Sequence, residues 1–326
     1  MARARDGRRV DLVRVASGAE PPLSGSRVPD FFIIGQPRSG TTALYEMLRC
    51  HPGIYMPDLK EPRYLESNST ELPGWLPQTL DEYLALFEPA ASNQLIGEAS
   101  PQYLRSQTAA AAIADLNPHA RCIAILREPA SHVRAFHLHL LRHRVETEPD
   151  LRKAVADEEV VRQGRVARRY SDAVDYVVQL QRFHELFPKK QLLVLVYEEF
   201  RDDNEGTVRE VLRFLGVDAD VPVAKLVVNQ AIGIRSVRLH GLIGAFQEGR
   251  GPVSAGIRRV ARAVLPAGAA NRAFERLRVR TIYSRPAPPD EAVVNELRER
   301  YRPNVVALSE YLGRDMLSFW GYDDVT

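Results

Sequence analysis

The sequence predicts an α/β fold of three layers, with a central parallel sheet flanked by helices and followed by a mostly helical C-terminal extension. Short apolar runs alternate along the chain with longer segments of helical periodicity, which is the order that builds such a sheet. The runs are also nearly continuous in apolar residues, as is typical of strands that are covered on both faces.

Five apolar runs are the candidate strands. The last two are the most continuous and are expected in the middle of the sheet. The five runs are residues 31–34, 53–56, 95–97, 122–126 and 192–197. A ligand site is expected at the carboxyl ends of these strands, where open α/β sheets bind their ligands.

The segments between the strands carry apolar residues at helical spacing. Gly216 follows the last of them directly and is a candidate C-cap. Helices are expected at residues 42–50, 79–87, 108–116, 129–144, 151–163, 173–187 and 207–215.

The pattern changes after residue 221. Residues 250–285 carry nine arginines and one acid, Glu275, and a further helix is expected at 290–312. We interpret residues 29–322 as one domain whose C-terminal helical part begins at about residue 230. Residues 1–28 are expected to be a flexible N-terminal segment.

Composition limits the partners and the compartment. Forty-four Lys and Arg against 42 Asp and Glu give a net charge of +2, so no nucleic-acid partner is expected. Cys50 and Cys122 are too few for a disulfide framework or a zinc cluster. His139 and His143 share a helical face, but no HExxH pattern accompanies them, and we expect no metal site. Without a signal peptide or membrane span, a cytoplasmic location is expected, and no oligomeric state is predicted.

Residues 35–42, GQPRSGTT, have the spacing of a phosphate-binding P-loop. A nucleotide triphosphatase would have lysine and then serine or threonine after the second glycine, whereas this chain has Thr41 and Thr42. The cation is therefore displaced to Arg38. Backbone N–H groups at a helix N-terminus bind an anion whatever the side chains are. The loop predicts an oxyanion site; the alternative is a tight turn with no ligand.

This loop is also where a family resemblance begins. PRSGTTAL, followed by HPGIYMPDLKEPRYL, resembles the 5′-phosphosulfate loop of sulfotransferases that use 3′-phosphoadenosine 5′-phosphosulfate (PAPS). Later parts of the family resemble GEASPQYL, AILREPASHVRAF, LLVLVYEEF and residues 299–320, in that order. The resemblance covers residues 31–320. It implies a P-loop-like enzyme, without a metal ion, that sulfates a hydroxyl of a saccharide, glycolipid or small molecule.

The resemblance also implies a donor site in two parts. Arg127, at the end of the fourth strand, would bind the 3′-phosphate, since its guanidinium can offer a bidentate fork. The alternative for Arg127 is a surface cation paired with Glu128 or Asp115. The 5′-phosphosulfate would be bound by the loop residues Pro37, Arg38, Ser39, Gly40, Thr41 and Thr42.

The helix after Arg127 departs from the family pattern. The family has a serine about two turns into this helix, but the matching Ala135 has no donor. If residues 131 and 132 are an insertion, Arg134 and His137 become the ligands. Alternatively, Ser131 near the helix start serves, and all three remain candidates.

A base must take the proton of the acceptor hydroxyl, and a positioned base contributes about 10² to 10⁴ in rate. By the resemblance this base is Glu61, in DLKEPRYL, whose backbone is expected to be extended because Pro62 follows. The alternative for Glu61 is a structural ion pair with Arg63. Lys60 either neutralises the departing bridging oxygen or keeps Glu61 ionised.

Two further assignments complete the implied catalytic group. Arg38 and the loop amides would stabilise charge on the bridging oxygen. Glu98, at the end of the third strand, is either the rival base or a residue that orients Arg38 or a loop hydroxyl.

Residues 257–265, IRRVARAVL, place apolar residues on one helical face and arginines on the other. This pattern fits weak contact with an anionic membrane surface, an ordinary surface helix, or a lid over an anionic acceptor. Two other functions remain open for the whole chain. One is a P-loop kinase or NTPase, which would need a lysine at position 41, and the other is a non-catalytic nucleotide-binding protein.

Overall fold

The structure is a computed structural model, and it describes residues 27–66, 73–157, 159–162, 165–222, 233–234, 283–284 and 290–323. Residues 1–26 and the basic segment 257–265 lie outside these ranges. The expectation of a membrane-surface helix therefore falls outside the described residues, as do residues 1–26 of the segment expected to be flexible. The last two residues of that segment are described: Arg27 donates hydrogen bonds to the carbonyls of Ala91 and Gln94, and Val28 packs against the core.

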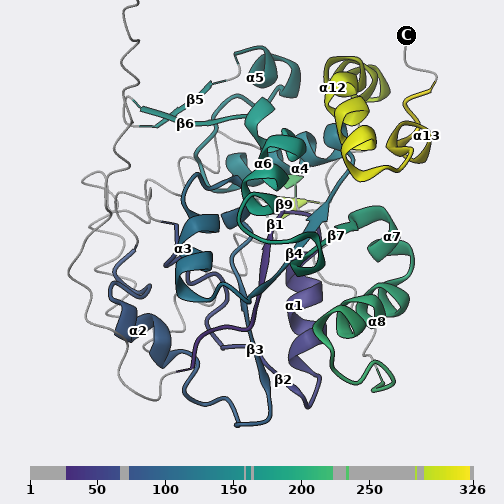
Figure 1. Ribbon diagram of the computed structural model, residues 1–326. Helices are drawn as coiled ribbons and strands as arrows, with labels where there is room; N and C mark the ends of the chain where they lie inside the picture. The colour runs from purple at the N-terminus through teal and green to yellow at the C-terminus, as the bar shows by residue number, and fades with distance from the viewer. Residues whose placement is uncertain are drawn as a thin grey trace, which may run out of the picture.

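A parallel five-stranded sheet forms the centre of the described fold (Figure 1). Its strand order is β2-β3-β1-β4-β7, so the first strand lies in the middle of the sheet. The strands are β1 (Phe31–Gly35), β2 (Ile54–Tyr55), β3 (Leu95–Ala99), β4 (Arg121–Leu126) and β7 (Leu192–Val196). All five expected strands are present, and the three-layer α/β class is confirmed. β4 is an interior strand as expected, but β7, which was also expected in the middle, is an edge strand of the described sheet.

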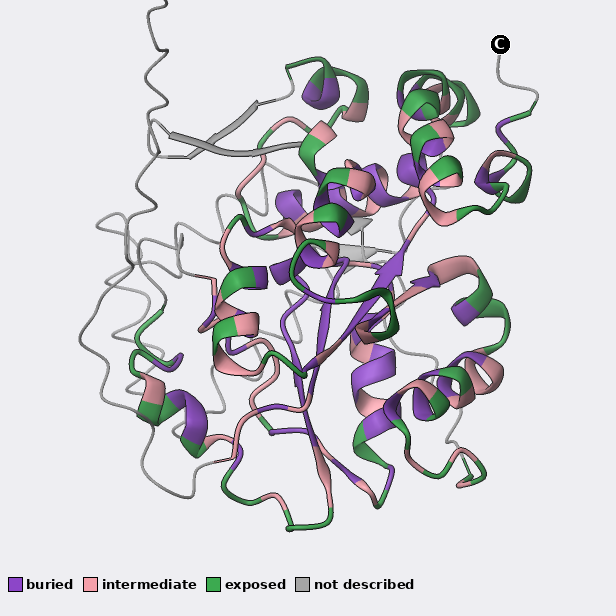
Figure 2. Cartoon of the chain, viewed as in Figure 1, coloured by how far each residue is buried: buried purple, intermediate pink, exposed green. Residues whose placement is uncertain are grey.

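Alternate residues of β1 face opposite layers of the core, as the pleat of a strand requires. Phe31 and Ile33 pack in the cluster that includes α1 (Thr41–Arg49) and α8 (Asn204–Leu215). Phe32 and Ile34 pack in the larger cluster on the other face. Figure 2 shows the strands buried between these layers while the outward faces of the helices are exposed. The helices of the second layer are α3 (Ala109–Leu116), α4 (Pro129–Arg142), α6 (Tyr176–His184) and α12 (Glu291–Leu312).

The remaining described helices are short. They are α2 (Leu80–Ala85), α5 (Leu151–Asp157), α7 (Tyr197–Asp202) and α13 (Met316–Trp320), with 3₁₀ turns η1 (Tyr103–Arg105), η2 (Ser171–Ala173) and η3 (Lys189–Gln191). Gly216 ends α8 at φ 72°, so its predicted role as a C-cap is confirmed.

The C-terminal helix α12 packs within the second layer. α12 contacts both α4 and α6, and α13 folds back against α12 (Figure 1). Between residue 223 and residue 289 the structure describes only β8 (Gly233–Ile234) and β9 (Tyr283–Ser284), which pair antiparallel. The expected helical extension is thus described at 291–320, and most of residues 230–290 lies outside the described ranges.

Two expected element boundaries are wrong. The helix expected to run to residue 163 ends at Asp157, and β5 (Glu159–Arg162) then pairs antiparallel with β6 (Arg165–Arg169). Val160 and Val161 are β-branched, which disfavours helix and favours strand. The strand expected to include Tyr197 ends at Val196, and Tyr197 begins α7.

Candidate active site

The loop between β1 and α1 ends at Gly40, in a backbone conformation that glycine adopts much more easily than other residues. Gly40 has φ 87°, and a Cβ atom there would come 3.1 Å from the ring of Phe200. Gly40 is also the N-cap of α1 and provides no side-chain cap. The first amides of this helix are therefore left to an external acceptor, which is the condition for an anion site.

Two buried donors of the loop lack a partner. Neither Arg38 Nε nor Ser39 Oγ has a hydrogen-bond partner among the residues that the structure describes. Arg38 also adopts a left-handed backbone, with φ 67°, which costs a non-glycine residue about 1–3 kcal/mol. Buried donors without partners are rare in folded proteins. Their presence at this turn fits an anionic ligand.

Arg38 lies within a group of cations. Burial lowers the pKa of its guanidinium most, and the charges of Arg142 and Arg127 lower it further, while Tyr197 and Glu61 oppose the shift. Arg142 is the last residue of α4, and Arg127 precedes the N-cap of the same helix. Cations gathered in this way stabilise a ligand with more than one negative charge.

Arg127 is directed toward this loop. Its Nη1 donates a hydrogen bond to the carbonyl oxygen of Arg38 at 3.0 Å, and its guanidinium carbon lies 4.6 Å from the ring centroid of Tyr197. The backbone carbonyl of Arg127 accepts a hydrogen bond from Tyr176 at 2.7 Å. Arg127 Nε is buried and has no partner in the described part of the chain. Arg127 is therefore not the surface cation that the alternative interpretation expected.

The three candidate ligands on α4 occupy different environments. The charge of Arg127, after burial, lowers the pKa of Arg134, so these two guanidinium groups are neighbours. The amide of Ser131 donates to the Glu128 carboxylate at 2.6 Å, close to Arg127 in sequence. His137 is buried, and its ring nitrogens contact the Tyr170 hydroxyl at 2.8 Å and a backbone carbonyl at 3.4 Å. Arg134 therefore senses the charge of Arg127, whereas the His137 ring bonds within the protein interior.

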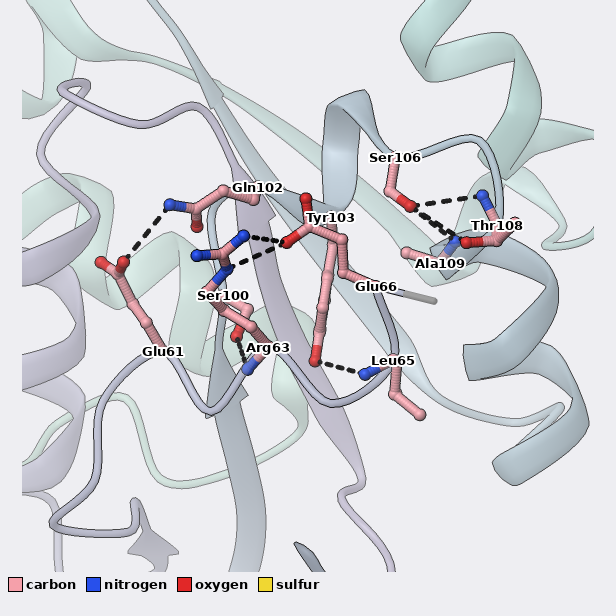
Figure 3. Close-up of polar contacts among 10 residues, drawn as sticks. All are labelled: Glu61, Arg63, Leu65, Glu66, Ser100, Gln102, Tyr103, Ser106, Thr108 and Ala109. Carbon is pink, nitrogen blue, oxygen red and sulfur yellow. Dashed lines mark hydrogen bonds and ion pairs between the residues drawn. The ribbon is translucent and has the colours of Figure 1, made fainter. Parts of the chain in front are cut away.

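The segment that carries Glu61 is fastened across the end of β3 (Figure 3). The amide of Glu61 donates to the carbonyl of Ala99 at 3.1 Å, and the amide of Arg63 donates to Ser100 Oγ at 3.1 Å. Glu61 has φ 62°, so the extended backbone expected before Pro62 is wrong. The hydrogen bonds to the β3 end hold the backbone in this left-handed conformation.

The Glu61 carboxylate is accessible. Its side chain is 37% exposed, and Oε1 forms an ion pair with Lys60, whose side chain is 17% exposed. The amide of Gln102 approaches Oε2 at 3.5 Å. Arg63 pairs with Glu66 at 2.9 Å, as Figure 3 shows, so the alternative pairing of Glu61 with Arg63 is wrong.

Glu98 has a different setting. Its side chain is fully buried at the end of β3, and Oε2 accepts a hydrogen bond from Tyr83 at 3.1 Å. Burial raises the pKa of Glu98 to about 7, although hydrogen bonds from Ser100, Tyr103 and Tyr83 oppose that shift. A carboxyl enclosed in this way has no surface to offer an acceptor molecule.

Sequence reasoning missed several residues of this site. His132 is fully buried, and neither ring nitrogen has a partner among the described residues. Its pKa is lowered well below 6.5 by burial and by the charges of Arg105, Arg127 and Arg38. Arg142 was missed as well. Nothing in the local pattern marks either residue, because only the path of α4 over the loop brings them to the site.

The described ranges contain no cluster of metal ligands and no membrane-spanning helix. No group of three or more histidine, cysteine, aspartate or glutamate residues there is arranged to hold a metal ion. Within the same ranges, no helix combines the length and the apolar composition needed to cross a bilayer.

The chain is similar to proteins of known function. Residues 29–221 match the family described as "Sulfotransferase family". The chain is 30% identical over 202 residues to the human bifunctional heparan sulfate N-deacetylase/N-sulfotransferase 3, covering 59% of this chain and 22% of that protein. It is 26% identical over 205 residues to the human heparan sulfate glucosamine 3-O-sulfotransferase 3B1, covering 60% of this chain and 48% of that protein.

A solved structure matches over a longer range. The crystal structure of a sulfotransferase from Alicyclobacillus acidocaldarius superposes with a TM-score of 0.63 at 25% identity, covering 90% of this chain and 99% of that one. By contrast, the chain spans only about a fifth of the length of the first curated relatives that it matches. The family match nevertheless covers more than half of this chain, from β1 through α8. The chain therefore belongs to the sulfotransferase family.

Proposed function

We propose that this protein transfers the sulfuryl group of PAPS to a hydroxyl of an acceptor molecule. The observation that carries the proposal is the relationship between Arg38 and Arg127. Both guanidinium groups keep a buried Nε atom without a partner in the described structure, and one donates to the backbone of the other. Two adjacent cationic positions at the carboxyl edge of the sheet suit a nucleotide that carries phosphate on both sides of its ribose.

The loop would bind the 5′-phosphosulfate end of the donor. The uncapped amides of α1, together with Arg38 and Ser39, supply the hydrogen-bond donors there. Arg127 would bind the 3′-phosphate, and Arg134, whose pKa is lowered by burial and by the charge of Arg127, is the candidate on α4 that would assist it. PAPS supplies the activated sulfuryl group when it is bound, and these side chains bind and orient it.

Glu61 is the proposed base. It takes the proton of the acceptor hydroxyl as the new bond to sulfur forms and the bond from sulfur to the 5′-phosphate oxygen breaks. Its partial exposure and its nearness to Arg38 support this role. The enclosure of Glu98 favours Glu61 over that rival. Arg38 and Lys60 would stabilise the negative charge on the departing oxygen.

A saccharide is the acceptor class that the relatives favour, because the names of the two curated enzymes above specify heparan sulfate or its glucosamine. A glycolipid or a small molecule remains within the proposal. No specific observation favours a P-loop kinase, since Thr41 stands where its lysine would be and Glu98 is enclosed.

Titration calorimetry tests the donor site. The purified chain is titrated with 3′-phosphoadenosine 5′-phosphate (PAP) and, separately, with ATP and Mg²⁺. Tight binding of PAP and weak binding of ATP are expected, and the reverse order would overturn the proposal. Transfer from ³⁵S-labelled PAPS to a panel of saccharides, glycolipids and small hydroxyl compounds then identifies the acceptor.

A further inference from the structure

Two carboxylates flank the proposed 3′-phosphate site. Glu128 follows Arg127 directly, and Glu198 follows Tyr197, the residue whose ring lies beneath the Arg127 guanidinium. Glu128 is buried, and Glu198 is near enough for the charge of Arg127 to lower its pKa, against the larger upward effect of burial. A carboxylate is the usual partner of a guanidinium, and an ion pair here would compete with any phosphate for the same donors.

In the structure, both carboxylates accept hydrogen bonds from donors other than Arg127. The hydroxyl of Tyr322 donates to Glu128 Oε1 at 2.7 Å, and the indole of Trp320 donates to Glu198 Oε2 at 3.1 Å. Arg298 Nε approaches Glu128 at 3.4 Å. All three donors come from the C-terminal segment, which is α12, α13 and the two residues that follow α13.

Backbone amides donate hydrogen bonds to most of the remaining lone pairs of the two carboxylates. Glu128 caps α4 by accepting from the amides of Ala130 and Ser131, at 3.3 and 2.6 Å. Its own amide donates to Glu198 Oε1 at 3.3 Å, so the two carboxylates belong to one hydrogen-bonded group. For Arg127 the structure records no carboxylate partner in the described ranges, and its Nε stays unbonded.

We infer that Trp320 and Tyr322 are positioning residues that hold Glu128 and Glu198 away from Arg127 and so preserve the selectivity for a 3′-phosphate. The inference rests on the proposed function, because it requires the donor nucleotide. When one of these donors is lost, a carboxylate lone pair loses its partner near a guanidinium whose Nε has no hydrogen-bond partner in the described ranges. That carboxylate then pairs with Arg127, and the affinity for the 3′-phosphate falls.

The test compares two nucleotides that differ only in the 3′-phosphate, PAP and adenosine 5′-phosphate. Tyr322→Phe and Trp320→Phe are each expected to weaken the binding of PAP about tenfold, which is the usual effect of losing a hydrogen bond to a charged group. The affinity for adenosine 5′-phosphate should not change. Tyr311→Phe is the matched control, since that hydroxyl bonds to His184 on α6. It should change neither affinity.

Two further variants separate positioning from a general loss of structure. Glu128→Gln placed in the Tyr322→Phe background removes the charge that captures Arg127, and it should restore most of the PAP affinity. Arg127→Ala alone should remove the preference for PAP, and adding Tyr322→Phe to it should then cost nothing more.

The outcomes are distinguishable. Equal weakening of PAP and adenosine 5′-phosphate in the Tyr322 and Trp320 variants, or no rescue by Glu128→Gln, would overturn this inference while leaving the proposed function intact. If the unaltered protein binds PAP no better than adenosine 5′-phosphate, the proposed function fails first.

Discussion

The guanidinium of Arg127 lies over the ring of Tyr197 at 4.6 Å and also bonds to the backbone of Arg38. The ends of β4 and β7 are therefore joined to the loop after β1 by one side chain. This contact fixes where the proposed 3′-phosphate site stands relative to the loop, and the first prediction follows from it.

Tyr197→Ala should weaken the binding of PAP about fivefold, because the Arg127 guanidinium loses the aromatic face that orients it. Tyr197→Phe keeps that face and should bind PAP nearly as well as the unaltered protein. Calorimetric titration of both variants measures the effect. Equal losses for alanine and phenylalanine would mean that the hydroxyl, rather than the ring, is what matters.

Glu61→Gln should lower kcat for sulfuryl transfer about 10²- to 10⁴-fold, because the amide cannot accept the hydroxyl proton. PAP affinity should be unchanged, since Glu61 is not assigned to donor binding. Steady-state kinetics with ³⁵S-labelled PAPS, together with PAP titration, separates the two quantities. A larger loss of kcat in Glu98→Gln than in Glu61→Gln would transfer the role of base to Glu98.

Glu98 should make the stability of the protein depend on pH. Its folded-state pKa, about 7, is raised from 4.5, so the folded state holds a proton that the unfolded state releases between those values. The free energy of unfolding should therefore fall as pH rises from about 4.5 to 7, by on the order of 3 kcal/mol for this group. Urea unfolding of the unaltered protein and of Glu98→Gln, across pH 5 to 8, measures the difference. Parallel curves for the two proteins would contradict the assignment.

The left-handed backbone of Arg38 permits a test of its side chain apart from its conformation. Arg38→Gly and Arg38→Ala both remove the guanidinium, and both should lose most PAP affinity. Glycine adopts φ 67° without strain, so the glycine variant should be more stable than the alanine variant by about 1 kcal/mol. Urea denaturation gives the stabilities. PAP affinity retained in either variant would remove Arg38 from the donor site.

The sequence was sufficient to locate the strands and the glycine-bounded turn before α1, because both depend on local pattern. A buried parallel strand is an apolar run, and a glycine-bounded turn before a helix is readable from a few residues. Arg127 was predictable for the same reason, since it directly follows such a run. The left-handed backbone at Glu61 was not predictable from the sequence. It is determined by hydrogen bonding to the end of β3, about 40 residues away in the sequence.

The contacts that surround Arg127 were beyond sequence reasoning. Glu128 meets Tyr322 across 194 positions of the chain, and Glu198 meets Trp320 across 122. Periodicity placed α12 correctly, but only its packing on α4 and α6 shows which polar groups it brings to the sheet edge. The helix expected to reach residue 163 was also predicted wrongly. It ends at Asp157, and the two β-branched valines that follow belong to β5 instead of continuing the helical spacing.

The central position of β1 has a consequence for how the protein opens. Because β1 is hydrogen-bonded to β3 on one side and to β4 on the other, its amides can meet solvent deuterons only when the whole sheet comes apart. Within the described sheet, the edge strand β2 pairs only with β3 and can fray by itself. Among the described strands, deuterium uptake should therefore be slowest in the residues that lead into the loop, so the candidate site is anchored to the slowest-exchanging part of the described sheet.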